Sequence, residues 1–88
     1  MKVAFRASFL RDLEDVTDKS FLARAKKVIE EVEQAPGVTQ VRNLKKLREP
    51  GNYYRIRLGD YRFGLLFEAD VLVFVRFLHR KEVYRYFP

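Results

Sequence analysis

The chain has 88 residues, enough for one small domain and too few for two. It contains no cysteine and a single histidine, which excludes a disulfide framework, a thiolate metal site and a multi-histidine metal centre. The formal net charge of +6 favours a polyanionic partner such as nucleic acid or an acidic protein. No apolar run reaches membrane-spanning length and the N-terminus lacks a signal-peptide pattern, so we expect a soluble cytoplasmic protein with no membrane partner.

The N-terminal half predicts one strand and two helices. Residues 2–7 alternate modestly between apolar and polar side chains, which favours a first strand. Ser8 is placed to cap a short helix. Thr17 or Asp18 is the expected cap of a second helix, which runs to about Gln34 and ends before a Pro-Gly pair. The apolar residues of the second helix recur with helical spacing: Phe21, Leu22, Ala25, Val28, Ile29 and Val32.

The C-terminal half predicts three consecutive strands. A basic connector over residues 38–52 leads into strands at 53–58, 61–68 and 71 to about 78. Gly59-Asp60 is typical of a two-residue hairpin turn, which fixes the register of the first two of these strands. The last strand is the most apolar, so we expect it to be central. The end of the chain is expected to form a short turn of helix.

These elements predict one α+β domain that spans residues 1–88. The order is β-α-α-β-β-β, and the two amphipathic helices must bury their apolar sides on one face of a mostly antiparallel, four-stranded sheet. The face expected to meet the helices carries apolar and aromatic side chains: Tyr54, Ile56, Leu58, Tyr61, Phe63, Leu65 and Phe67. The opposite face carries basic residues, an aromatic residue and a glycine: Tyr53, Arg55, Arg57, Arg62 and Gly64.

The second face of the hairpin is basic, with little acid to compensate it. The turn places Arg57 opposite Arg62 and Arg55 opposite Gly64, and like charges across a ladder are destabilising. An ordinary solvated face is one interpretation. We favour an anion-binding face, because the planar guanidinium binds phosphate through two hydrogen bonds. Gly64 would leave room for a backbone or base to approach, and Tyr53 would stack on a base.

The chain resembles a known family in two stretches, NLKKLREPGNYYRIRLGDYRFGLLFE and HRKEVY. They are similar to the RelE/ParE superfamily of type II toxins, and to its RelE branch most closely. The resemblance covers essentially the whole chain and implies a RelE-like microbial RNase fold. It also implies a ribosome-dependent endoribonuclease that cleaves mRNA in the ribosomal A site without a metal or another cofactor. In that reaction the ribose 2′-OH attacks the adjacent phosphate, which requires a base, cationic donors and an acid.

The resemblance implies roles for individual side chains. Arg55 and Arg57 match a pair of basic residues on one strand, with Arg55 counted among the substrate contacts. Arg62 is expected to stabilise transition-state charge on the scissile phosphate, and Arg80 to act similarly. Tyr84 is expected to stack on or lie near the reacting nucleotide.

Further contacts are expected from the connector and the end of the chain. Lys45 and Lys46 are candidates for contacts to mRNA or ribosomal RNA phosphates. Another interpretation of the chain end is an apolar tail over the core, formed by Tyr84, Tyr86 and Phe87. The resemblance favours a functional role for Tyr84 alone among these three.

The identity of the base stays open at this point. Some relatives place lysines where this chain has Arg55 and Arg57, and arginine does not act as a base in proteins. His79 is the first candidate, since imidazole exchanges protons near neutral pH. Glu49 and Tyr84 are the alternatives, and a solvated strand-end imidazole is the other interpretation of His79.

The register of the last strand decides where His79 points. If Ala69-Asp70 is a two-residue turn, Phe77 and His79 share the face of Arg62, and Arg76 points toward the helices. One additional loop residue reverses this arrangement.

The resemblance also implies partners and leaves two alternatives. A cognate antitoxin with a disordered, acidic or amphipathic segment is expected to fold onto the toxin. mRNA and the ribosome, with its ribosomal RNA, are the expected targets, and DNA is reached only through the antitoxin. One alternative is a ParE-like inhibitor of DNA gyrase without nuclease activity. The other is a non-toxic relative whose basic face serves only to bind an antitoxin.

Overall fold

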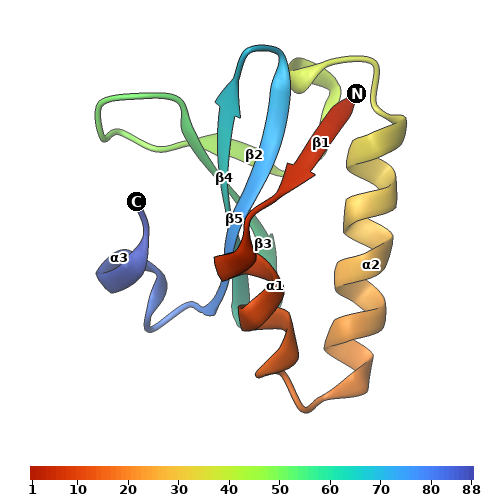
Figure 1. The fold of residues 1–88 in the computed structure, drawn as a ribbon, viewed down its shortest axis with the longest axis vertical. Coiled ribbons are helices and arrows are strands. Elements are labelled where there is room, and N and C mark those ends of the chain that lie inside the picture. Colours follow the sequence, from red (N-terminus) through yellow and green to blue (C-terminus); the bar gives the residue numbers. More distant parts are fainter.

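Five strands form one sheet in the order β1-β5-β4-β3-β2 (Figure 1). The computed structural model describes residues 1–88. The first strand is parallel to β5, and all other neighbours are antiparallel. The strands are β1 (Lys2–Phe5), β2 (Leu44–Lys46), β3 (Tyr53–Leu58), β4 (Tyr61–Glu68) and β5 (Val71–His79).

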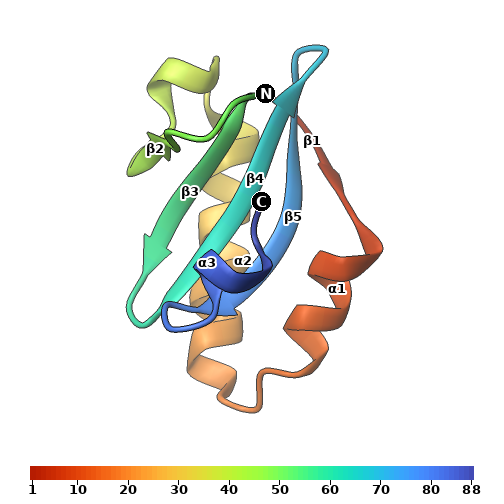
Figure 2. The same ribbon diagram turned by 90° about the vertical axis from the view of Figure 1, so that its left-hand side faces the viewer.

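The helices lie on both sides of this sheet. Helix α2 (Lys19–Gln34) covers one face, and the short helix α3 (Val83–Tyr86) lies against the other (Figure 2). The predicted N-cap of α2 is confirmed, since the Asp18 carboxylate accepts a hydrogen bond from the Ser20 backbone N–H at 2.9 Å. None of the helices has the length and apolar character that a membrane span requires.

Helix α1 (Ala7–Glu14) covers the part of the β5 edge that β1 leaves open. The Ser8 hydroxyl donates to the Val75 carbonyl at 2.6 Å, and the Asp12 carboxylate accepts from the Phe77 N–H at 2.9 Å. The prediction that Ser8 caps the helix is therefore wrong, because an unpaired strand carbonyl takes its hydroxyl. The helix begins two residues earlier than a Ser8 cap would place it, after Arg6, without a side-chain cap.

The connector contains a strand that the sequence did not predict, so the sheet has five strands and not four. Strand β2 pairs antiparallel with β3, which places Lys45 directly opposite Arg55. A strand of three residues is too short to show alternation, and its lysines suit a solvated edge. A single turn of 3₁₀ helix, η1 (Val38–Gln40), precedes it. The apolar β5 is an inner strand, although β4 takes the middle position.

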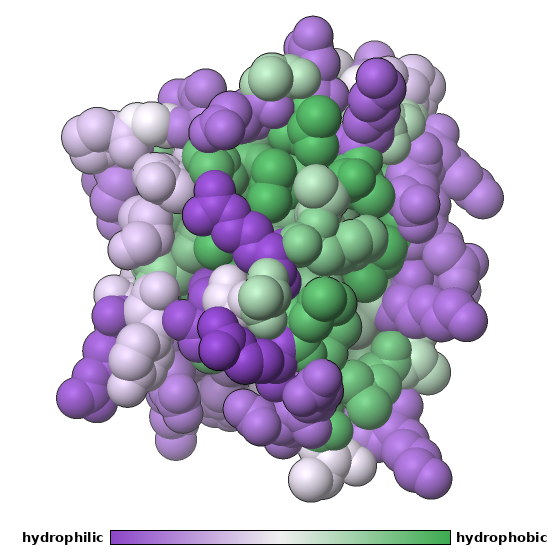
Figure 3. Space-filling model, viewed as in Figure 1, coloured by the Kyte–Doolittle hydropathy of each residue, from purple (hydrophilic) through white to green (hydrophobic).

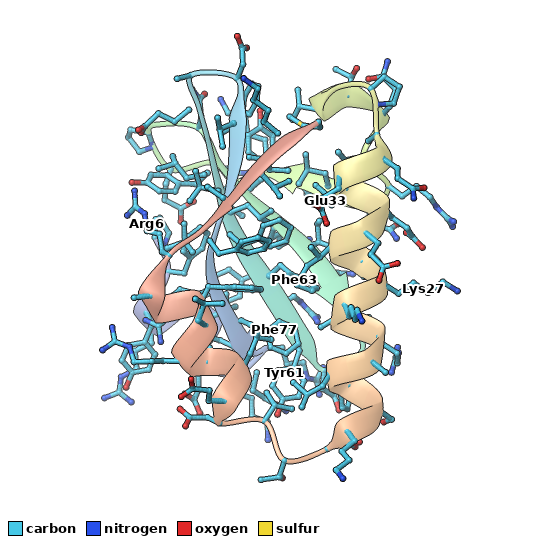
Figure 4. The ribbon with its side chains drawn as sticks, turned by 45° about the vertical axis from the view of Figure 1, so that its right-hand side comes forward. Arg6, Lys27, Glu33, Tyr61, Phe63 and Phe77 are labelled. Atoms are coloured by element: carbon cyan, nitrogen blue, oxygen red, sulfur yellow. The ribbon has the colours of Figure 1, made fainter.

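Aromatic side chains fill the layer between the sheet and the first two helices. Phe9, Phe63 and Phe74 are fully buried and Phe77 nearly so, and their rings contact one another. Figure 4 shows Tyr61, Phe63 and Phe77 between the sheet and α2. The predicted apolar face of the hairpin is therefore confirmed.

A β-bulge in β5 reverses the predicted orientation of His79. Ala69 and Asp70 do form a two-residue turn, in which both residues have positive φ. The ladder then shifts between Gly64 and Leu65, so β5 gains one residue relative to its partner strand. His79 consequently pairs with Tyr61 on the helix side of the sheet. The bulge likewise turns Phe77 toward the helices and places Arg76 opposite Gly64, against the prediction for both residues.

Candidate anion-binding face

The face of the sheet opposite α2 carries basic side chains in two adjacent rows. Successive ladder partners form the first row: Lys45, Arg55, Gly64 and Arg76. The second row contains Arg57, Arg62 and Leu78. We call Lys45, Arg55, Arg57 and Arg62 the cationic cluster. The predicted register of the hairpin, with arginine opposite arginine, is confirmed.

No carboxylate neutralises the cationic cluster. The chain has two ion pairs, and both involve other arginines. Arg76 is held by Asp12, with its Nε at 2.7 Å and its Nη2 at 3.0 Å from the two carboxylate oxygens. Arg80 lies 3.7 Å from Asp60 in an exposed pair, which contributes little to stability. Positive charge therefore accumulates on one side of the sheet without an internal counterion.

Arg55 is the most unusual member of the cluster. It is only 9% exposed, and its guanidinium makes no hydrogen bond or ion pair within the chain. Each guanidinium nitrogen keeps contact with solvent, since no fully buried side-chain nitrogen in the chain lacks a partner, so the group is free to bind a partner from outside. An anion from outside the chain would supply that partner.

Arg62 is held in place by the hairpin turn. Its Nη1 donates to the Gly59 carbonyl at 2.7 Å and to the Tyr61 carbonyl at 2.8 Å. Burial, followed by the positive charges of Arg57, Arg55 and Arg80, lowers the pKa of Arg62 from its usual value. Guanidinium groups remain charged at neutral pH even so, and the same forces that lower the pKa favour a nearby anion. Arg80 is thus one of the positive charges that act on Arg62.

Two shallow grooves adjoin Arg55. The first is lined by residues of β2 and β3: Asn43, Leu44, Lys45, Arg55 and Arg57. The second contains the end of the connector and a residue of α3: Lys45, Lys46, Leu47, Arg48, Glu49, Arg55 and Tyr84. We call the second the Tyr84 groove. Tyr84 is 77% exposed there, so its ring is free to meet a ligand. The structure thus brings Lys45, Lys46 and Tyr84 together with Arg55.

Three features interpreted as part of the site lie elsewhere or are occupied. His79 faces the helix side, where its Nδ1 accepts from the Lys81 N–H at 3.2 Å. Tyr53 packs edge-on against Phe87 with ring centroids 5.6 Å apart, and it lines a different hollow from the two grooves beside Arg55. The space above Gly64 is filled by the same phenylalanine and not left for a substrate.

Sequence reasoning missed one contributor to the site. Arg48 lines the Tyr84 groove, and Glu49 is the only acidic residue there. Glu49 was one of three alternatives for the base, and only the folded connector brings it beside Tyr84 and Arg55. The only signal in the sequence for these two residues is their position directly before a Pro-Gly pair. That position does not indicate toward which face their side chains point.

The order and packing of the elements are those of small toxins of the RelE/ParE superfamily. The model of the family described as "ParE toxin of type II toxin-antitoxin system, parDE" matches residues 3–84. The chain is 40% identical to Toxin RelE3 of Methanocaldococcus jannaschii over the full length of both. It therefore belongs to the RelE/ParE superfamily, as a RelE-like toxin of a type II toxin-antitoxin system.

Solved structures agree with this membership. The RelB-RelE antitoxin-toxin complex of Methanococcus jannaschii matches with a TM-score of 0.79 at 37% identity, covering 97% of this chain and 99% of that one. The toxin-antitoxin complex RelBE2 of Mycobacterium tuberculosis matches with a TM-score of 0.61 at 27% identity, covering 90% and 96%. YafQ of E. coli shares the fold alone, with a TM-score of 0.65 at 12% identity over 94% of this chain and 97% of that one.

Proposed function

We propose that this toxin is a ribosome-dependent endoribonuclease that cleaves mRNA in the ribosomal A site. The observation that carries the proposal is Arg55, which has little exposed surface and no hydrogen-bond or ion-pair partner within the chain, beside Arg57 and Arg62. A phosphodiester supplies the missing anion, and its oxygens match the planar donors of arginine. Lys45 and Lys46, at the edge of the sheet, extend the positive surface toward flanking phosphates.

The cationic cluster would stabilise the charge that develops on the scissile phosphate. In the reaction, the 2′-oxygen forms a bond to phosphorus and the bond to the 5′-oxygen of the next nucleotide breaks. Arg62 keeps Nε and Nη2 available for the phosphate, because the turn carbonyls bind only Nη1. Fixed donors of this kind act without reorganisation during the reaction. Arg80 contributes a second guanidinium from the end of β5.

We assign the base to Glu49. Its carboxylate is the only proton acceptor of that type in the Tyr84 groove, where it would take the 2′-OH proton. Tyr84 would pack against the reacting nucleotide, and its hydroxyl is our candidate donor to the leaving 5′-oxygen. His79 has no role in this assignment, since the bulge turns it to the other face of the sheet.

We also propose a cognate antitoxin as the physiological partner. The two relatives above with 37% and 27% identity were solved as complexes with antitoxins. Apolar side chains gather over the middle of the face that β1 crosses (Figure 3), and Phe5 and Leu10 are 42% and 49% exposed. An exposed apolar surface of this kind fits a protein partner. Co-purification of the toxin with the small protein encoded beside it, lost on Phe5→Ser and Leu10→Ser substitution, tests this proposal.

The nuclease proposal is tested by primer extension on a translated mRNA, with purified toxin and with or without ribosomes. Cuts at codon positions only when ribosomes are present support it, and Arg62→Ala should abolish them. Absence of cuts under both conditions would overturn it. A supercoiling assay with DNA gyrase then tests the ParE-like alternative, which the matching family description keeps open.

A further inference from the structure

Phe87 is seated directly on the backbone of Gly64. The side chain is 3% exposed, and a Cβ built on Gly64 would lie 2.7 Å from its Cγ and 2.8 Å from both Cδ atoms. Real side chains do not approach so closely, so only glycine admits the ring at this position. The edge-on ring of Tyr53 forms a second wall of the seat.

The seat attaches α3 to the basic face. This helix has four residues, and a single turn is not stable without tertiary contacts. Val83 and Phe87, at either end of the turn, are buried in a small cluster with Leu78. Tyr86 adds a weaker contact, with the Arg76 guanidinium 5.7 Å from its ring centroid.

Tyr84 depends on this attachment for its position. It lies between the two buried anchors of α3, and no hydrogen bond or aromatic contact fixes its own ring. Its place in the groove beside Arg55 and Glu49 follows from where the α3 backbone is held. If Phe87 leaves Gly64, the turn loses one of its two apolar anchors.

We propose that Phe87 is a positioning residue that acts through Tyr84. Its ring, seated on Gly64, holds Tyr84 against the groove in which Glu49 and Arg55 meet the RNA. The proposal rests on the proposed nuclease function. The strands that carry the cationic cluster, β2, β3 and β4, pair with one another and not with α3. Loss of the seat should therefore reduce kcat and leave KM near its original value.

A purely structural role would have a different signature. The cluster of Leu78, Val83 and Phe87 is separate from the main core, which lies on the other face of the sheet. Removal of the Phe87 ring should thus release α3 and leave the sheet folded. Hydrogen exchange distinguishes the two regions, because the Arg85 and Phe87 amides bond within the turn and the Arg6 amide bonds to β5.

The experiment perturbs the seat from both sides. Phe87→Ala removes the ring, and Gly64→Ala displaces it by placing a methyl group where it lies. Gly37→Ala is the matched control, since its new Cβ meets only the end of the flexible Gln40 side chain, at 3.1 Å. We expect both seat variants to lower kcat by about 10- to 100-fold, with Phe87→Leu intermediate and Gly37→Ala unchanged.

A double-mutant cycle with Tyr84→Ala tests whether the effect passes through Tyr84. Phe87→Ala should lower kcat no further in a Tyr84→Ala background. An equal additional loss in that background would overturn the proposal, as would unchanged exchange of the Arg85 and Phe87 amides in Phe87→Ala.

Failure of the nuclease proposal has a separate signature. If the unmodified toxin cleaves nothing, the proposed function fails, and with it the catalytic part of this inference. The exchange measurement still reports whether the seat holds α3 and Tyr84 in place.

Discussion

Arg57 and Arg62 face each other directly across the β3–β4 ladder, and neither has an acidic partner. Such a pair opposes folding in the free protein, because like charges at opposed positions of a sheet repel each other. The same pair becomes favourable once an anion lies between or above the two guanidinium groups. The toxin therefore keeps a locally unfavourable arrangement at the position where a phosphate is proposed to bind.

Relief of this repulsion should stabilise the free toxin. We expect Arg57→Gln to raise the free energy of unfolding by about 0.5 kcal/mol at low ionic strength. The gain should shrink in high salt, which screens exposed charges. Urea denaturation at two salt concentrations measures the effect. Lys27→Gln is the control, because Lys27 is an exposed residue of α2, on the other face of the sheet from the cluster (Figure 4). A loss of stability in Arg57→Gln at low salt would contradict this account.

The two candidates for the base should respond differently to substitution. Glu49→Gln removes the proton acceptor of the Tyr84 groove, and we expect cleavage to fall by about 10²- to 10⁴-fold. His79→Gln should leave cleavage near its original rate, since His79 lies on the helix side of the sheet. Single-turnover cleavage of ribosome-bound mRNA makes the comparison. A severe defect in His79→Gln together with an active Glu49→Gln would reverse the assignment.

Asp12 should be the most important single carboxylate for stability. It satisfies both the Arg76 guanidinium and the Phe77 N–H, and its side chain is only 10% exposed. Asp12→Ala leaves both donors without a partner, so we expect a loss of about 2–3 kcal/mol in the free energy of unfolding. Asp15→Ala, at the exposed C-cap of the same helix, is the control for urea denaturation. Similar stabilities of the two variants would show that the β5 edge does not need Asp12.

Asp18 should make the stability of α2 depend on pH. Hydrogen bonds from the Ser20 hydroxyl and backbone N–H lower the pKa of the Asp18 carboxyl below its ordinary value. A carboxyl whose pKa is lower in the folded state stabilises the folded protein at pH values above its unfolded-state pKa, about 3.9. This contribution is lost as the pH falls through the folded-state pKa. The difference in thermal midpoint between the unmodified toxin and Asp18→Ala should thus be larger at pH 7 and shrink in acid.

The control for this measurement is Asp18→Asn. Its amide oxygen still accepts the Ser20 bonds and carries no charge, so its advantage over Asp18→Ala should not change with pH. If the difference in thermal midpoint between the unmodified toxin and Asp18→Ala does not change with pH, the ionisation of Asp18 does not contribute to stability.

The elements with strong local signals could be predicted from the sequence. Helix α2 has an apolar stripe and a capping aspartate, Asp18, that agree with each other. The two residues of the Gly59-Asp60 turn fix the β3–β4 register, and with it the position of every arginine on that hairpin. The basic face was therefore predictable, since it follows from the length of the turn and from the alternation of side chains between the two faces of each strand.

The remaining features depend on contacts that no local pattern reports. The bulge in β5 falls within an apolar run without glycine, so the sequence could not show that His79 turns away from Arg62. Strand β2 exists because β3 offers it a partner. Gly64 indicated a close approach correctly, but the group that approaches is Phe87 from the same chain, 23 positions later in the printed sequence.

The parallel pairing of β1 with β5 has a consequence for synthesis. Residue 2 finds its ladder partner only at residue 71, so the sheet cannot close until nearly the whole chain has been made. The Tyr84 groove comes later still, because it requires β2, β3 and the α3 turn together. A nascent chain thus lacks the surface with which we propose the finished toxin attacks mRNA. Under that proposal, the topology would delay activity until β5 and α3 have been made, and so would protect the ribosome that makes the toxin.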